Sequence, residues 1–150
     1  MNAPDPGYEQ RTRDSFARQN AMATLGATLE VIEPGRVVIG MAHSAALTQQ
    51  HGFLHAGMLA AALDSACGYA AFTLMPADSG VLTIEFKINL LAPARGPRFQ
   101  LVGQVTKAGR TISVVDGQAW QHDGSGNARK LVATMTATIM TVTGRDDVRR

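Results

Sequence analysis

The most constraining feature of this chain is one stretch of small residues, 55–74 (HAGMLAAALDSACGYAAFTL). The stretch shows no strict alternation of apolar and polar residues and is long enough for a helix of about five turns. Small side chains surround most of its circumference, which is typical of a helix buried on several sides. The rest of the chain must therefore form a layer that covers this helix.

The remaining sequence predicts strands for that layer. Alternating or β-branched runs indicate strands over residues 28–33, 36–43, 81–91, 99–107, 110–121 and 131–142. In the run 81–91 we expect the apolar residues at even positions, Leu82 to Leu90, to share one face. The short connections favour antiparallel pairing, since parallel neighbours need a crossover of a dozen or more residues. We therefore predict an α+β fold in which a curved antiparallel sheet of five to six strands wraps a long central helix.

Length and composition fit a single domain. The 150 residues are 45% hydrophobic and 17% charged, which allows a buried core without disulfides. We expect a flexible N-terminal tail over 1–14, one domain over 15–143 and a charged tail over 144–150. A weakly amphipathic helix is expected over 9–25. The start of the sequence does not resemble a secretory leader and no long apolar run occurs, so we expect a cytoplasmic protein outside the membrane.

Charge is distributed unevenly along the chain. Between residues 37 and 77 the only formally charged side chain is Asp64, whereas residues 86–115 carry five basic residues and no acidic one. This contrast suggests an apolar body with a positive face that suits an anionic ligand. Nucleic acid is disfavoured as that ligand, because aromatic residues make up only 5% of the chain and no binding motif is present.

Asp64 is the outstanding candidate for chemistry. A carboxylate in an apolar helix loses hydration, and ionisable groups in such settings cluster at functional sites. The alternative is a structural aspartate that bonds a neighbouring backbone group or faces solvent. The sequence around Asp64 leaves both interpretations open.

The loop that feeds this helix, residues 49–57, is the second candidate. It brings polar amides, a histidine and small residues to a helix N-terminus, where free N–H groups can hold an oxyanion or simply be capped. Ala56 and Asp64 are eight residues apart, about 12 Å along a helix axis. If both act on one carbonyl, they must come from two copies of the chain related by a two-fold axis.

The pattern Gln49, then Gly52 to Gly57 (GFLHAG), then Asp64, followed by residues 80–93 and the hairpin 107–111 (KAGRT), resembles the hotdog-fold acyl-CoA thioesterases. The resemblance covers about residues 15–142 and is strongest to the PaaI-like branch, the phenylacetate-degradation thioesterases. It implies hydrolysis of an acyl-CoA thioester with an aromatic or medium-chain acyl group.

The resemblance also implies roles for particular residues. His55-Ala56-Gly57 stands where the family has His-Gly-Gly, so the Ala56 N–H would be the oxyanion donor and His55 would organise the loop. Asp64 would act as general base or nucleophile, and Gln49 and Thr83 would position water or the thioester. The site residues so implied are Gln49, His55, Ala56, Gly57, Asp64 and Thr83.

Coenzyme A would meet the basic residues. Its phosphates suit the side chains of Arg95, Arg98, Lys107 and Arg110, although each could equally belong to a solvated strand face. We expect no cofactor, and no metal because His51 and His55 lack a third ligand. The family resemblance implies at least a homodimer and favours a homotetramer.

Two other functions stay open at this point. A non-catalytic acyl-CoA sensor would keep the basic face and an apolar tunnel but could dispense with Asp64. A hotdog dehydratase or hydratase would pair a histidine with an acidic residue in a motif that this sequence does not contain.

Overall fold

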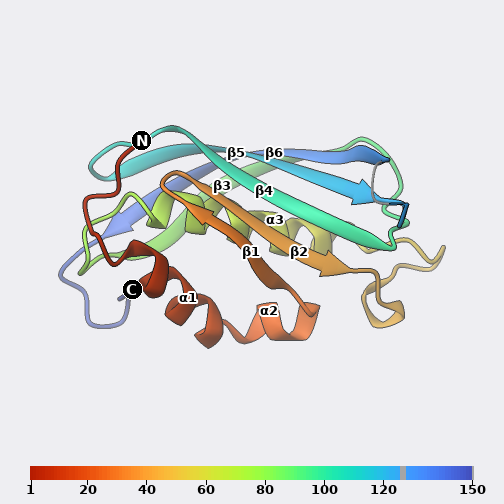
Figure 1. Ribbon diagram of the computed structural model, residues 1–150, viewed down its shortest axis with the longest axis horizontal. Coiled ribbons are helices and arrows are strands. Elements are labelled where there is room, and N and C mark those ends of the chain that lie inside the picture. The colour runs from red at the N-terminus through yellow and green to blue at the C-terminus, as the bar shows by residue number, and fades with distance from the viewer. Residues whose placement is uncertain (126–127, 150) are drawn as a thin grey trace.

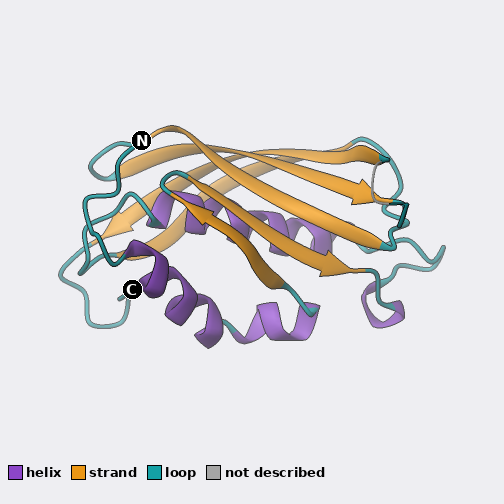
Figure 2. Ribbon diagram, in the orientation of Figure 1, coloured by secondary structure: helices purple, strands orange, loops and turns teal. Residues whose placement is uncertain are grey.

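The computed structural model describes residues 1–125 and 128–149. All six strands belong to one antiparallel sheet, in the order β1-β2-β4-β5-β6-β3. The sheet is one curved layer with α3 inside its curve, and α1 and α2 lie along its lower side in the view of Figures 1 and 2. The elements are α1 Tyr8–Arg18, α2 Asn20–Leu25, β1 Thr28–Glu33, β2 Arg36–Ala42, a short 3-10 helix Ala45–Leu47, α3 Ala56–Phe72, β3 Gly80–Leu90, β4 Arg98–Lys107, β5 Ile112–His122 and β6 Arg129–Val142. The predicted α+β architecture is confirmed.

Helix α3 is buried along most of its length, as its small residues predict. It lies so close to the sheet that a Cβ atom on Gly103 of β4 would come within 2.3 Å of the Ala66 carbonyl oxygen. Only glycine permits this contact between the helix backbone and the strand backbone. The core fills the space between α3 and the sheet, and its largest fully buried side chains include Leu63, Phe72, Leu101, Val115 and Ile139.

The N-terminal segment departs from the expectation of a tail over 1–14. Helix α1 begins at Tyr8, and the side chain of Thr12 is fully buried. The Arg11 guanidinium donates to the carbonyl oxygens of Phe72, Met75 and Pro76, which lie at the C-terminal end of α3. Arg11 thus caps the end of α3, where the Phe72 carbonyl also accepts from the Met75 N–H, and holds α1 in place.

The expected single helix over 9–25 is divided in two. Gln19 has extended backbone angles and ends α1 while it begins α2. Its side-chain oxygen accepts a hydrogen bond from the Ser65 hydroxyl of α3 at 2.9 Å. The chain bends at this position, and Met22 and Leu25 of α2 are buried in the core.

Strand β3 lies at one edge of the sheet and contains a β-bulge. Thr83 pairs with Ile139 and Glu85 with Thr138, so Ile84 is an additional residue without a partner on β6. Since side chains alternate along a strand, one extra residue exchanges the two faces. Leu82 therefore lies on the opposite face from Phe86, which corrects the prediction that the even positions share one face.

Candidate active site

Asp64 and Thr83 are in direct contact. The Thr83 hydroxyl donates to Asp64 Oδ1 at 2.8 Å, although the residues are 19 positions apart in the chain. Asp64 lies on α3, and Thr83 precedes the bulge in β3, on the face that the buried Ile139 shares. The bulge allows both Thr83 and Phe86 to face the helix.

Burial raises the pKa of the Asp64 carboxyl above its ordinary value of 3.8, and the hydrogen bond from Thr83 opposes part of that rise. A carboxylate whose pKa is raised accepts a proton more readily near neutral pH. Within the part of the chain that the structure describes, Thr83 bonds only Oδ1, so Oδ2 is available to water or to a substrate.

The N-terminus of α3 offers one free backbone donor. The His55 side chain caps the helix, because its Nδ1 accepts from the Gly57 N–H at 2.8 Å. The His55 carbonyl oxygen accepts from the N–H groups of Met58 and Leu59. Among the described residues, the Ala56 N–H is therefore the one backbone donor in the first turn of α3 that has no hydrogen-bond partner. A helix N-terminus with a free N–H can stabilise an oxyanion.

Gln49 shapes the loop before α3. Its side-chain oxygen accepts from the N–H groups of His51 at 2.6 Å and Phe53 at 3.3 Å. Its backbone N–H donates to the Phe53 carbonyl oxygen. The oxygen expected to position water is therefore engaged within the loop, and the NH₂ group is the part of Gln49 that can face a ligand.

A cavity of about 530 Å³ lies beside this loop and the start of α3. It is lined by Gln49, His55 and Ala56 and by apolar residues that include Phe53, Leu54, Leu59, Leu90 and Leu91. Asp64 and Thr83 do not line it. One chain therefore carries two separate half-sites, the Ala56 cavity near the end of β3 and the Asp64–Thr83 pair near its beginning.

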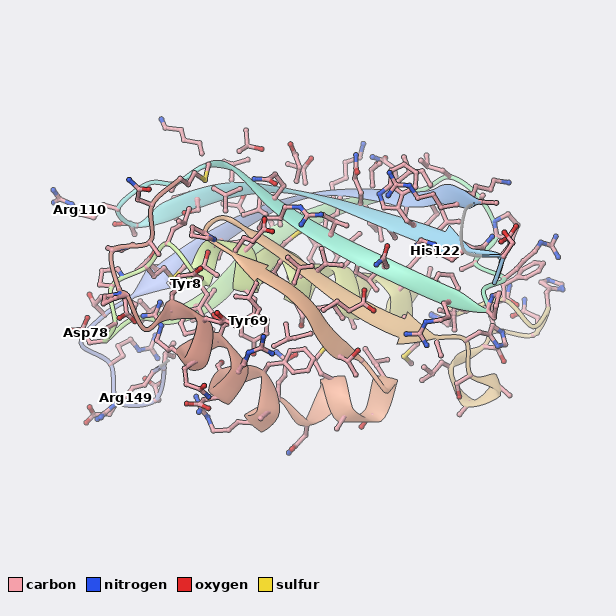
Figure 3. The ribbon with its side chains drawn as sticks, viewed as in Figure 1. Tyr8, Tyr69, Asp78, Arg110, His122 and Arg149 are labelled. Carbon is pink, nitrogen blue, oxygen red and sulfur yellow. The ribbon has the colours of Figure 1, made fainter. Side chains whose placement is uncertain are left out.

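The four basic residues do not form one cluster within a chain. Arg98 pairs with His122 at one end of β4, whereas Lys107 lies at the other end, beside the turn that carries Arg110. Arg110 and His122 mark these two ends in Figure 3. Lys107 is nine positions beyond Arg98 along the strand, which is roughly 30 Å. Only Arg95 is close to the cavity, with its guanidinium 4.6 Å from the centre of the Phe53 ring.

Some residues of the site could not be singled out from the sequence. The segment after β3, Leu91 to Ala94, lines the cavity although it carries no polar group. Phe72, near the other end of α3, is fully buried in the core. Cys67 is also buried, and burial raises the pKa of its thiol.

Comparison with known proteins identifies the family. A family model described as "Thioesterase superfamily" matches residues 51–128, more than half of the chain. The chain belongs to the Thioesterase superfamily. This thioesterase is 34% identical, over 67% of its length and 71% of the other protein, to a protein of Saccharolobus solfataricus whose name describes it provisionally as an esterase.

Solved structures agree with this assignment. A thioesterase family protein from Silicibacter pomeroyi is 53% identical, with a TM-score of 0.88 over 92% of this thioesterase and 100% of that chain. The PaaI protein of E. coli, from the phenylacetic acid degradation operon, has a TM-score of 0.81 over 91% of this chain and 94% of its own at 20% identity. The predicted likeness to PaaI is thus confirmed at the level of the hotdog fold. No helix among the described residues is long and apolar enough to span a membrane.

Proposed function

We propose that this thioester hydrolase acts on acyl-CoA, releasing CoA and an aromatic or medium-chain carboxylic acid. The observation that carries the proposal is the position of the two half-sites along β3. Ala56 lies in a cavity with Leu90 near one end of this strand, and Asp64 contacts Thr83 near the other end. Each half-site alone lacks the group that the other supplies.

The free edge of β3 supports a dimer that unites them. Four of its apolar side chains, at positions 82, 84, 86 and 90, are between 43% and 54% exposed. An exposed apolar edge strand is a template for pairing with another chain. In a two-fold antiparallel pair centred on Lys87, with the bulge residue Ile84 left out of the pairing on both strands, Thr83 of one subunit lies opposite Leu90 of the other. The Ala56 cavity then adjoins the partner's Asp64, and each dimer contains two complete sites.

In this composite site the proposed chemistry follows from the groups present. The Ala56 N–H donates to the thioester carbonyl oxygen and stabilises the negative charge that develops on it. The partner's Asp64 either removes a proton from the attacking water or attacks the carbonyl carbon itself. Thr83 orients the Asp64 carboxylate through Oδ1. With water as the nucleophile, the C–S bond then breaks and the CoA thiolate takes the proton that Asp64 removed, which releases the free acid. With Asp64 as the nucleophile, the C–S bond breaks to leave a mixed anhydride of Asp64 and the acyl group, and the CoA thiolate takes a proton from the water that then hydrolyses this anhydride to the free acid.

The same two-fold symmetry brings basic residues of the two subunits towards each other. It brings the end of one subunit that carries Arg95 and Arg98 towards the end of the other that carries Lys107 and Arg110. We propose that the CoA phosphates bind across the subunit boundary, with arginine forming the charge-assisted contacts. Tetramer formation and a cytoplasmic location stay predictions.

Two variants test the composite site sharply. Asp64→Asn removes the proton acceptor. Ala56→Pro removes the donor N–H, and proline is favoured at the first position of a helix. The extended backbone of His55, φ −61° and ψ 136°, already suits a following proline. Each homodimer should lose at least about a hundredfold in kcat/KM for thiol release from acyl-CoA.

Mixing the two variants after reversible unfolding should restore activity. Half of the dimers are then mixed, and each mixed dimer has one intact site, so about one quarter of the wild-type activity returns. A mixture as inactive as its components would refute the composite site. Acyl-CoA binding without thiol release by the wild type would favour the sensor interpretation instead.

A further inference from the structure

A second cavity lies close to Asp64 and plays no part in the mechanism above. Its volume is about 330 Å³, and it lies between α1, α3, the beginning of β3 and the C-terminal residues 147–149. It is lined by Ser15, Gln19, Tyr69, Val81 and Leu82, together with Val148 and the charged residues Arg18, Asp147 and Arg149. In Figure 3, Tyr69 lies next to helix α1, and Arg149 lies towards the same end of the molecule.

The polar wall of this cavity is rich in hydrogen-bond donors. Ser65 donates to the Gln19 side-chain oxygen at 2.9 Å, which fixes the amide, and no described residue accepts from its NH₂ group. The hydroxyls of Tyr69 and Ser15 are 3.2 Å apart and share one hydrogen bond, so one of their two protons stays available. The opposite wall, formed by Val81 and Leu82, is apolar.

Residues of both walls of the smaller cavity are neighbours in the chain of Asp64 or Thr83. Ser65, which holds Gln19, follows Asp64 directly in the chain, and Leu82 directly precedes Thr83. Tyr69 is five residues beyond Asp64 on α3, about 7.5 Å along the helix axis. A group attached to a carbonyl at Asp64 therefore has to extend over one to two helical turns, and partly around the helix towards α1, to reach the Tyr69 hydroxyl.

The dimer register joins this cavity to the larger one. The pairing that sets Thr83 opposite Leu90 of the partner subunit continues with Leu82 opposite Leu91 and Val81 opposite Ala92. Leu91 and Ala92 line the 530 Å³ cavity of their own subunit. The two cavities thus become one channel, with Asp64 between them. Arg95 lies at the larger cavity, which makes that side the exit for CoA.

The C-terminal residues form the far side of the smaller cavity. Val148 packs directly on the start of β3, since a Cβ atom on Gly80 would lie 2.6 Å from Val148 Cγ1. The cavity is thus suited to the end of an acyl group and not to the long pantetheine arm. We infer that it binds the far end of the acyl group and selects acyl chains that carry a hydrogen-bond-accepting oxygen there. This inference rests on the proposed acyl-CoA thioesterase function.

A matched pair of substrates tests it. 5-Oxohexanoyl-CoA and hexanoyl-CoA differ by one carbonyl oxygen near the end of the chain. We expect the wild type to favour the oxo substrate by roughly tenfold or more in kcat/KM, because the plain chain leaves the donors unpaired. Their non-hydrolysable thioether analogues should show the same order of Kd, which measures the preference without turnover.

Two substitutions assign the preference to the cavity. Tyr69→Phe removes the hydroxyl, and Gln19→Glu keeps the acceptor for Ser65 while it replaces the NH₂ donor by an oxygen. Both should reduce the ratio of kcat/KM for the two substrates to within about threefold. Tyr8→Phe makes the same chemical change away from the cavity and should keep the full preference.

The outcomes separate this inference from the proposed function. Equal kcat/KM for the two substrates, or a preference for hexanoyl-CoA, overturns the inference and leaves the thioesterase intact. Loss of turnover with both, but a retained difference in Kd between the analogues, refutes the proposed function and supports the cavity. A preference that survives in both variants overturns the assignment to Gln19 and Tyr69.

Discussion

Asp64→Asn should abolish turnover and stabilise the fold at the same time. The carboxylate is half-buried, and burial raises its pKa despite the hydrogen bond from Thr83. Asparagine can still accept that hydrogen bond but carries no charge that needs hydration. Loss of the proton acceptor should lower kcat/KM by about 10²–10⁴-fold. Removal of the desolvated charge should raise the free energy of unfolding by on the order of 1 kcal/mol at neutral pH.

The sign of the pH dependence follows from the raised pKa. The folded protein holds the Asp64 proton more tightly than the unfolded chain, so the ionised group destabilises the fold above its folded pKa. The stability advantage of Asp64→Asn should therefore be complete at neutral pH and vanish on acidification towards 3.8, the ordinary value for an aspartate. Urea denaturation followed by the fluorescence of Trp120, the single tryptophan, measures this difference.

Asp116→Asn is the matched control, because Asp116 also accepts a hydrogen bond from a threonine hydroxyl, that of Thr106, at 2.8 Å. It lies on the exposed outer face and should leave thiol release unchanged. Two results would refute the reasoning. An Asp64→Asn enzyme with wild-type turnover would remove the carboxylate from the chemistry, and one that loses both activity and stability would show that Asp64 is structural.

Three further changes should each have a distinct effect. Thr83→Val removes the hydrogen bond that lowers the Asp64 pKa, so the acid limb of the kcat/KM profile should move to higher pH, whereas Thr83→Ser should leave it in place. Gly103→Ala forces a Cβ atom against the Ala66 carbonyl oxygen, so the free energy of unfolding should fall by about 1–3 kcal/mol or more. Urea denaturation should show this as a lower midpoint. Phe86→Asp should turn dimers into inactive monomers in sedimentation experiments, because β3 then carries a charge at the centre of the proposed interface. Full activity in a monomeric Phe86→Asp variant would disprove the shared site.

Much of the fold is predictable from local patterns. The small residues of α3 predict a buried helix, and the short turns between alternating runs predict antiparallel order. The prediction over 9–25 failed in part because apolar spacing does not show where a helix bends. Only the tertiary contact between Gln19 and Ser65 reveals the break. Similarly, Arg11 is an ordinary surface residue by sequence, and its role as a cap depends on carbonyls that lie more than 60 positions away.

The candidate site shows the same division. Spacing along one helix is enough to separate Ala56 from Asp64, since the rise per residue is fixed. The contact between Asp64 and Thr83 follows from the pairing of β3 with β6, which periodicity does not encode. The basic residues illustrate the limit most clearly. They are close in the sequence, but an extended strand carries Arg98 and Lys107 to opposite ends of the sheet.

The single unpaired residue Ile84 has a consequence for how members of this family are aligned. This extra residue shifts the alternation of side chains by one position. Before Ile84 the odd-numbered residues of β3 face α3, and after Ile84 the even-numbered residues do. A strand without the bulge could direct Thr83 to Asp64 or direct Phe86 to the helix, but not both. The length of β3 is thus a part of the site in its own right. Deletion of one residue here would turn the Thr83 hydroxyl to the other side of the sheet without changing its identity.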